Sequence, residues 1–189
     1  MKKRSFLSFW SASDGASAVE FALIAPVLLL MTIGIIEISL MMLTQNIMES
    51  VTFTASRLGK TGYVEAGITR EETIIQALHD AADGLLDTTK ITVDTQSYNE
   101  FGDVGSPEPF VDANGNGIHD DGENYTDVNA NGQYDTDMGA AGEGNAGQVV
   151  VYIVTYPWSV STPLLSSLMG DHGVFSLTAR AVVKNEPFE

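Results

Sequence analysis

A continuous apolar segment near the start of the chain limits the folds that are open to it. Residues 21–43 contain only three polar side chains, Thr32, Glu37 and Ser39. As an α-helix this segment would extend roughly 35 Å, which exceeds the hydrocarbon thickness of about 30 Å of a bilayer. Basic residues at positions 2–4 precede it, and such residues stay on the cytoplasmic side. We therefore predict a single-pass membrane protein whose N-terminus is cytoplasmic and whose C-terminal part is exported.

A cleaved secretory signal peptide is the alternative reading of this segment. Signal peptides have a shorter apolar stretch that ends at a small-x-small cleavage site. The run here is longer, and Thr44-Gln45-Asn46 offers no such site, so the pattern favours a retained helix. Glu37 lies well inside the span, where its carboxyl group should be neutral, paired or turned toward protein. Pro26 can kink the helix because it removes a backbone hydrogen bond.

Charge and composition exclude several classes of function. The net charge is −16, and no Lys or Arg occurs between residues 91 and 179. Such a surface repels nucleic acid, which is bound mainly through phosphate neutralisation by Lys and Arg. The absence of Cys excludes disulfides, thiol catalysis and Cys-ligated zinc. His79, His119 and His172 show no ligand spacing and no nucleophile motif is present, so we do not expect an enzyme.

The part that follows the span has an α+β pattern. Ile47, Val51, Ala55 and Leu58 form one apolar stripe, which extends the helix to about Leu58 before Gly59 and Gly62 end it. Thr69 and Glu72 form a capping box for a second helix. Its predicted buried face contains Ile74, Leu78, Ala81, Ala82 and Leu85. Residues 91–98, 148–160 and 174–184 read as strands, so we predict a small ectodomain of one helix packed on an antiparallel sheet.

Residues 102–147 form an acidic insert with an internal repeat of fifteen residues. Glu108 to Gly122 aligns with Glu123 to Asp137, and each unit contains Asp-x-Asn-x-Asn-Gly-x-x-Asp. This is the ligand spacing of an EF-hand loop, in which positions one, three, five, seven, nine and twelve give oxygen atoms to Ca²⁺. The first-loop candidates are Asp112, Asn114, Asn116, the Ile118 carbonyl, Asp120 and Glu123. Gly117 would make the sharp turn at position six.

The second loop is less complete than the first. Its candidates are Asp127, Asn129, Asn131, the Gln133 carbonyl and Asp135. Position twelve is Met138, which gives no hard oxygen, so Asp137 is the candidate to replace it. Magnesium fits poorly because it retains several waters. A disordered acidic linker is the alternative for the whole insert.

The insert resembles the tandem calcium-binding repeats of dockerin-like and thrombospondin type 3-like exported proteins. Only Asn124, Tyr125 and Thr126 separate the two loops, too few residues for the helices between paired EF-hands. The exact recurrence of the ligand spacing favours calcium over a linker.

The run from Gly15 to Pro26, Gly-Ala-Ser-Ala-Val-Glu-Phe-Ala-Leu-Ile-Ala-Pro, resembles the processing site of TadE-like minor pseudopilins. These are bacterial inner-membrane proteins of the tight-adherence (Tad, or Flp) pilus. The resemblance implies that a prepilin peptidase cuts between Gly15 and Ala16, and that Glu20 serves processing or assembly. Two later stretches, 55–59 and 181–188, resemble the family more weakly, and Glu37 matches an acidic position common in its span.

The expected function is therefore structural. The resemblance implies a pseudopilin-like subunit that assembles with other pilus subunits and the assembly machinery, at the membrane or in a pilus at the cell surface, for adhesion or secretion. A stand-alone calcium-binding protein of the cell envelope is the alternative. The predicted organisation is a leader at 1–15, a membrane and extended helix at 16–59, an ectodomain from 60–101 and 148–189, and the calcium-binding insert at 102–147.

Overall fold

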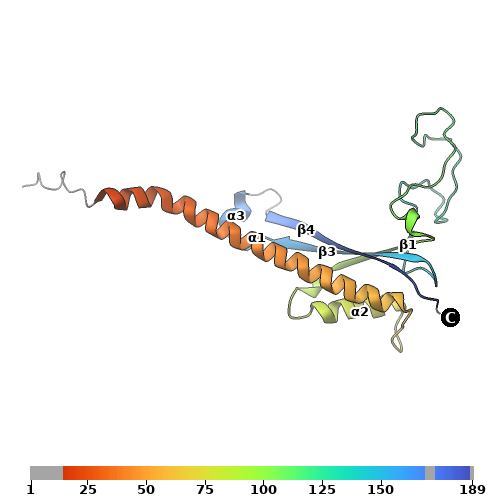
Figure 1. The fold of residues 1–189 in the computed structure, drawn as a ribbon, viewed down its shortest axis with the longest axis horizontal. Helices are drawn as coiled ribbons and strands as arrows, with labels where there is room; N and C mark the ends of the chain where they lie inside the picture. The colour runs from red at the N-terminus through yellow and green to blue at the C-terminus, as the bar shows by residue number, and fades with distance from the viewer. Residues whose placement is uncertain (1–14, 169–172, 188–189) are drawn as a thin grey trace, which may run out of the picture. The chain divides into compact units, whose positions relative to one another are not determined.

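The computed structural model describes residues 15–168 and 173–187. The predicted leader, Gly15 excepted, and the basic residues at positions 2–4 lie outside the described residues. The chain divides into two compact units: residues 1–42 with 159–174, and residues 43–158 with 175–189. The element order of a long helix followed by a helix and a sheet confirms the predicted α+β class (Figure 1).

Helix α1 (Ala16–Lys60) runs through 45 residues. Among the described residues it is the one helix long and apolar enough to cross a membrane. Phe21, Leu23 and Ile24 are each more than 60% exposed, as expected of side chains that face lipid. The helix ends at Lys60, and Gly62 follows with a φ of 67°. Its predicted end near Leu58 is therefore correct to within two residues.

In the first unit, Glu37 is buried, with only 6% of its surface exposed. Its carboxylate accepts hydrogen bonds from the Thr162 backbone N–H at 2.8 Å, the Thr162 hydroxyl at 2.6 Å and the Ser161 backbone N–H at 3.3 Å. These donors directly precede the short helix α3 (Pro163–Leu168). Of the three arrangements expected for Glu37, the structure therefore has the one turned toward protein, in which uncharged protein donors replace water.

Helix α2 (Arg70–Ala82) begins at the predicted capping box. The Glu72 N–H donates to the Thr69 hydroxyl at 3.1 Å, and the Thr69 N–H donates to the Glu72 carboxylate at 2.7 Å. The backbone N–H of Thr69 lowers the pKa of Glu72. The prediction that Leu85 is buried is wrong, since it is 61% exposed. The helix has already ended at Ala82, and the turn at Gly84 (φ 72°) brings Leu86 to the core instead.

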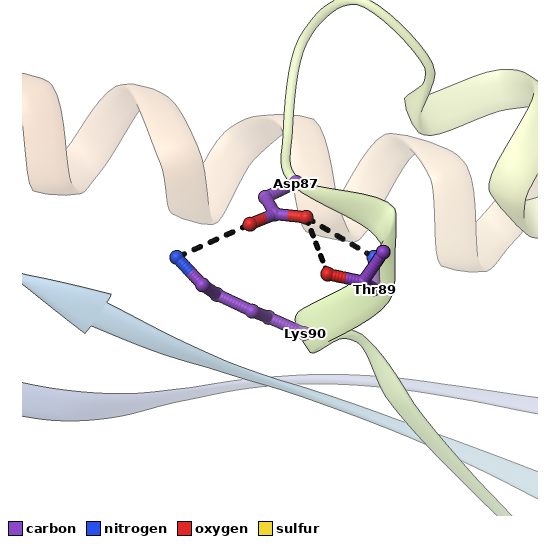
Figure 2. Close-up of polar contacts among 3 residues, drawn as sticks. All are labelled: Asp87, Thr89 and Lys90. Carbon is purple, nitrogen blue, oxygen red and sulfur yellow. Dashed lines mark hydrogen bonds and ion pairs between the residues drawn. The ribbon is translucent and has the colours of Figure 1, made fainter.

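A short 3₁₀ helix, η3 (Thr88–Lys90), connects α2 to the sheet. Asp87 caps it by accepting hydrogen bonds from the Thr89 N–H at 3.3 Å and the Thr89 hydroxyl at 2.6 Å (Figure 2). The Lys90 ammonium pairs with the other carboxylate oxygen at 3.2 Å. The hydroxyl of Thr89 is the main cause of the lowered pKa of Asp87. This local cap fixes the direction in which the chain enters the first strand.

The sheet has four strands in the order β2-β1-β3-β4. Its members are β1 (Thr92–Tyr98), β2 (Ala140–Ala141), β3 (Val149–Ser159) and β4 (Val174–Lys184). Strands β1 and β3 are antiparallel, with Thr92 opposite Thr155 and Tyr98 opposite Val149. The three predicted strands are confirmed, as is the central position of β3. The two-residue strand β2 was not predicted because it lies in the polar insert.

The second unit has its core where α1, α2 and the sheet meet. The apolar stripe of α1 packs there through Val51 and Ala55, against Ile74 and Leu78 of α2 and Tyr152 of β3. Figure 1 shows α2 beside the C-terminal half of α1. Gly59 approaches the Tyr152 hydroxyl so closely that a Cβ atom at position 59 would collide with it. The stripe in the second half of α1 is therefore a docking face for α2 and the sheet of the same chain.

Candidate functional site

The acidic insert leaves the sheet between β1 and β3 (Figure 1). It begins near the short 3₁₀ helix η4 (Phe101–Asp103) and returns through β2. Strand β2 pairs with β1, with Ala140 opposite Ser97. The insert therefore starts after β1 and, on its return, pairs with β1, an inner strand of the sheet.

Equivalent residues of the two repeats meet at an antiparallel bridge. Phe110 pairs with Tyr125, and these residues occupy the same position in their repeats. The Val111 N–H donates to the Asn124 carbonyl and the Thr126 N–H to the Pro109 carbonyl, each at 2.8 Å. Because the bridge joins equivalent residues in opposite directions, an approximate two-fold axis relates the two loops.

Four rings pack together around this axis. His119 stacks on Tyr134, with ring centroids 3.8 Å apart and planes 13° apart. Phe110 and Tyr125 contact both of these rings edge-on, at centroid distances of 5.6–5.8 Å. Loss of solvent is the first cause of the raised pKa of Tyr125, followed by the charge of Asp127. The place of His119 in this cluster was not predicted, although His119 aligns with Tyr134 at the same position of the repeat.

In the first loop, two carboxylates, those of Asp112 and Asp120, accept most of the hydrogen bonds described next. Asp112 accepts backbone hydrogen bonds from Gly115 at 2.6 Å and Gly117 at 2.8 Å. The bond from Gly117 is the main reason that the pKa of Asp112 is lowered. The amide groups of two asparagines, Asn114 and Asn116, donate to one oxygen of Asp120 at 2.6 and 2.8 Å. Gly117 has the positive φ, 78°, expected of the sharp turn at position six.

Glu123 closes this loop at position twelve. One carboxylate oxygen accepts from the Ala113 N–H at 2.8 Å, and the other from the Asp120 N–H at 3.1 Å. The backbone N–H of Glu123 also donates to the Asp120 carbonyl at 3.1 Å. The carboxylate therefore spans the loop from position two to position nine.

The second loop repeats the same arrangement around Asp127 and Asp135. The Gly132 N–H donates to Asp127 at 2.9 Å, and Gly132 has a φ of 81°. The amides of Asn129 and Asn131 donate to one oxygen of Asp135 at 2.8 and 2.5 Å. Position four differs: the first loop has Gly115 there with a φ of 75°, and the second has Ala130 with a φ of 60°.

Position seven, the expected carbonyl ligand, is held in the same way in both loops. The Ile118 N–H donates to the Asn116 side-chain oxygen and the Gln133 N–H to that of Asn131, each at 2.8 Å. Within the described ranges, no three His, Cys, Asp or Glu side chains are gathered closely enough to hold an ion by themselves. Amide and carbonyl oxygens would have to complete any coordination shell.

Asp137 is tied to the sheet. Its two carboxylate oxygens accept from the Tyr98 hydroxyl at 2.9 and 3.1 Å. Burial, and then the bond to Asp137, raises the pKa of Tyr98 to about 12. Met138, beside it, packs on the small apolar cluster of Tyr98, Val149 and Val151. The residues after the second loop thus fasten the insert to β1 and β3, and a ligand role for Asp137 stays a prediction.

Glu108 is a candidate that sequence reasoning missed. It is fully buried, and its carboxylate oxygens accept from the Val128 N–H at 2.7 Å and the Asp135 N–H at 3.1 Å. The Glu108 N–H donates to the Asp135 carbonyl at 3.0 Å. The alignment of Glu108 with Glu123 in the fifteen-residue repeat was the signal that could have found it.

The predicted processing residues lie at the start of α1. Gly15 directly precedes the helix, which begins at Ala16 and contains Glu20. All three residues are exposed. A Cβ atom built on Gly15 meets nothing within 4 Å, so the fold of the chain itself does not require a glycine here.

In a comparison with known proteins, the model of the TadE-like protein family matches residues 15–57. No curated protein and no solved structure matches the chain. The match begins at Gly15 and ends within the last turns of α1, before α2, the sheet and the insert. It supports a subunit associated with a Tad pilus. The segment that contains Gly15, Ala16, Glu20 and Glu37 is thus similar to TadE-like proteins.

Proposed function

We propose that the chain is a membrane-anchored, pseudopilin-like structural subunit that takes part in assembly of a Tad-type pilus. The observation that carries this proposal is the family match over residues 15–57, which starts at the glycine directly before α1. TadE-like proteins are structural components of pili, so no enzymatic role is proposed. Large apolar side chains are exposed along the first part of α1, as on a helix that faces lipid, and this supports an anchor in the bacterial inner membrane. We place the ectodomain on the exported side.

The proposed first step is cleavage by a prepilin peptidase between Gly15 and Ala16. Cleavage would leave a free amino group at Ala16, close to the membrane face. The exposed carboxylate of Glu20 on a neighbouring subunit could pair with that amino group. Gly15, Ala16 and Glu20 are exposed, which supports access by an enzyme and by neighbouring subunits.

Mass spectrometry of the N-terminus of the membrane-extracted protein tests this step. We expect the mature chain to start at Ala16 and the Gly15→Leu variant to remain a full-length precursor. Because a side chain at Gly15 meets nothing in the fold, accumulation of precursor would report on the peptidase. Gly34→Leu is the matched control, since its site on α1 is equally open, and it should be processed normally. A wild-type protein that keeps residues 1–15 would favour the alternative, a stand-alone calcium-binding protein of the envelope.

We further propose that the insert binds calcium through its two loops. The proposed ligands are those predicted from the sequence in each loop. The donor chemistry fits, since the proposed ligands are carboxylates, side-chain amides and backbone carbonyls, the hard oxygens that Ca²⁺ prefers. Hydrogen bonds join positions one, three, five, nine and twelve of the first loop, which supports a loop folded around its proposed ligands. Asn114 and Asn116 donate their amide N–H groups to Asp120, so both amides would turn their oxygens toward a bound ion.

Calcium would order the insert by neutralising its charge. The first loop carries Asp112, Asp120 and Glu123 within twelve residues, and no Lys or Arg lies between residues 91 and 179. Ordering this glycine-rich backbone costs roughly 1–2 kcal/mol per residue. Exported modules bind calcium at about 10⁻⁴–10⁻³ M, and binding at a hundredfold excess over Kd contributes about 2.7 kcal/mol.

Hydrogen exchange of the full-length protein in detergent tests the calcium proposal. We expect residues 108–138 to exchange slowly in millimolar calcium and rapidly in chelator or in magnesium alone. Asp112→Ala should abolish protection of the first loop. The control Asp121→Asn removes a neighbouring acid that is not a proposed ligand and should behave as wild type. Equal exchange with and without calcium would show that the insert is an acidic linker.

A further inference from the structure

The two repeats leave one glutamate without a loop and one loop without a glutamate. Along the chain the order is Glu108, first loop, Glu123, second loop. Glu123 follows the first loop at position twelve, whereas the second loop has Met138 there. Glu108 precedes the first loop and has no earlier loop to close. The fold brings these two unmatched parts together.

Glu108 contacts the second loop through the same three hydrogen bonds by which Glu123 contacts the first. Each carboxylate accepts from the N–H groups at positions two and nine of its loop, at 2.7 and 3.1 Å for Glu108 and at 2.8 and 3.1 Å for Glu123. Each backbone N–H donates to the position-nine carbonyl, at 3.0 and 3.1 Å. The equivalence follows from the approximate two-fold axis, which exchanges the loops and their glutamates together.

Burial of Glu108 provides a second and independent argument. Its side chain is fully buried, whereas Glu123 is partly exposed. The two ion pairs of the described residues lie elsewhere, at Lys60–Glu186 and Lys90–Asp87. A carboxylate has about four lone-pair positions, and two backbone donors fill two of them. A cation at the remaining positions would offset the cost of burying this carboxylate.

We infer that Glu108 is the twelfth-position ligand of the second calcium loop, supplied by the other repeat. This inference rests on the proposed calcium function and changes its residues: Glu108 takes the place that the sequence suggested for Asp137. The Asp137 carboxylate instead faces the Tyr98 hydroxyl on the sheet, at 2.9 and 3.1 Å from its two oxygens. The two loops then form one unit, because Glu108, the ligand of the second loop, lies just before the Phe110–Tyr125 bridge at the start of the first loop.

Calcium titration calorimetry of the full-length protein in detergent tests this assignment, with Ca²⁺ alone as the ligand. The wild type should bind two ions. Glu108→Gln should weaken one site by about tenfold or more, because it removes a bidentate charged ligand, and should leave the other within threefold. Glu123→Gln, the symmetry-matched variant, should weaken the other site. Asp137→Asn should leave both sites unchanged.

The outcomes separate the assignment from the calcium proposal itself. A wild type that binds no calcium overturns both. Two sites in Glu108→Gln with wild-type affinities, or loss of a site in Asp137→Asn alone, overturns the role of Glu108 and leaves the calcium proposal standing. Glu108→Asp covers the case in which Glu108→Gln does not fold, since it keeps the charge and shortens the reach. It should weaken the same site, and unchanged binding in this variant would equally overturn the assignment.

Discussion

The two loops of the insert share a repeat but differ in what supports them. The first loop is closed by Glu123, a residue of its own end, and most of its side chains are exposed. The second loop is closed by the buried Glu108, which comes from before the first loop, and is fastened to the sheet through Asp137 and Met138. The same ligand pattern is thus maintained by local contacts in one copy and by long-range contacts in the other.

The difference shows how a short tandem array can be closed without an additional segment. The twelfth position of the first loop is Glu123, which is the first residue of the second repeat. Because no third repeat follows, the second loop has no such glutamate after it. With two copies related by a two-fold axis, the first glutamate reaches the last loop. Contacts of the second loop therefore depend on the fold of the whole insert, whereas those of the first depend on about twelve consecutive residues.

The largest expected effect comes from Tyr98→Ala, which would remove the support of the second loop. Tyr98 is 3% exposed, and loss of a buried aromatic side chain costs about 3–5 kcal/mol. Thermal unfolding of the full-length protein in detergent should show this loss. Hydrogen exchange should show faster opening of residues 127–138 than of residues 112–123. Equal opening of both loops would contradict the difference in support.

Tyr98→Phe is the matched control, because it keeps the ring and removes only the hydroxyl that donates to Asp137. The loss should then be limited to a hydrogen bond to a charged group, about 1.5–3 kcal/mol. If Tyr98→Phe were as unstable as Tyr98→Ala, packing of the ring would contribute nothing.

A smaller effect is expected where position four differs. Ala130 has a φ of 60°, a conformation that disfavours side chains, while the first loop has Gly115 there. Ala130→Gly should stabilise the second loop by about 1 kcal/mol, and Gly115→Ala should destabilise the first by a similar amount. Exchange rates of the two loops in each variant measure these opposite changes. Changes of the same sign would mean that the backbone at position four is not equivalent in the two copies.

The smallest effect is expected from pH, in the absence of calcium. Because backbone donors lower the pKa of Asp112, its ionised form stabilises the folded first loop. This stabilisation is complete above the ordinary value of 3.8 and is lost as the pH falls through the lower folded value. NMR titration of the Asp112 carboxyl should give the midpoint below 3.8, and Asp112→Asn should abolish the associated change in exchange. A midpoint at or above the ordinary value would contradict the bonds drawn to this carboxylate.

The sequence predicted those parts of the fold whose signals are local. The capping box at Thr69 and Glu72 and the alternation in β4 from Leu177 onward depend on neighbouring residues, and both are present. Leu85 was misplaced because helical periodicity continues past Ala82 in the sequence, although Gly84 has already turned the chain. Phe175 lies in the same alternation but is 36% exposed, since it is near the end of its strand.

The candidate site could be predicted only in part, for the same reason. Ligand spacing within a loop is visible along the chain, and positions three, five and nine do converge in both copies. Glu108 lies 27 residues from its partner Asp135, so only the symmetry of the pairing identifies it. The repeat alignment shows that Glu108 and Glu123 are equivalent. Only the antiparallel bridge between Phe110 and Tyr125 shows that Glu108 contacts the second loop and not the first loop beside it.

The ends of the insert have a consequence for protein engineering and for the origin of this chain. Tyr98 and Val149 are directly opposed at the end of the β1–β3 pair, so everything between them occupies the place of a hairpin turn. The entropy of closing such a connection grows only slowly with its length. A segment of this kind can therefore be gained, lost or exchanged among related chains with little cost to the sheet. A graft onto another hairpin would need host residues equivalent to Tyr98, Val149 and Val151, which contact Asp137 and Met138 here.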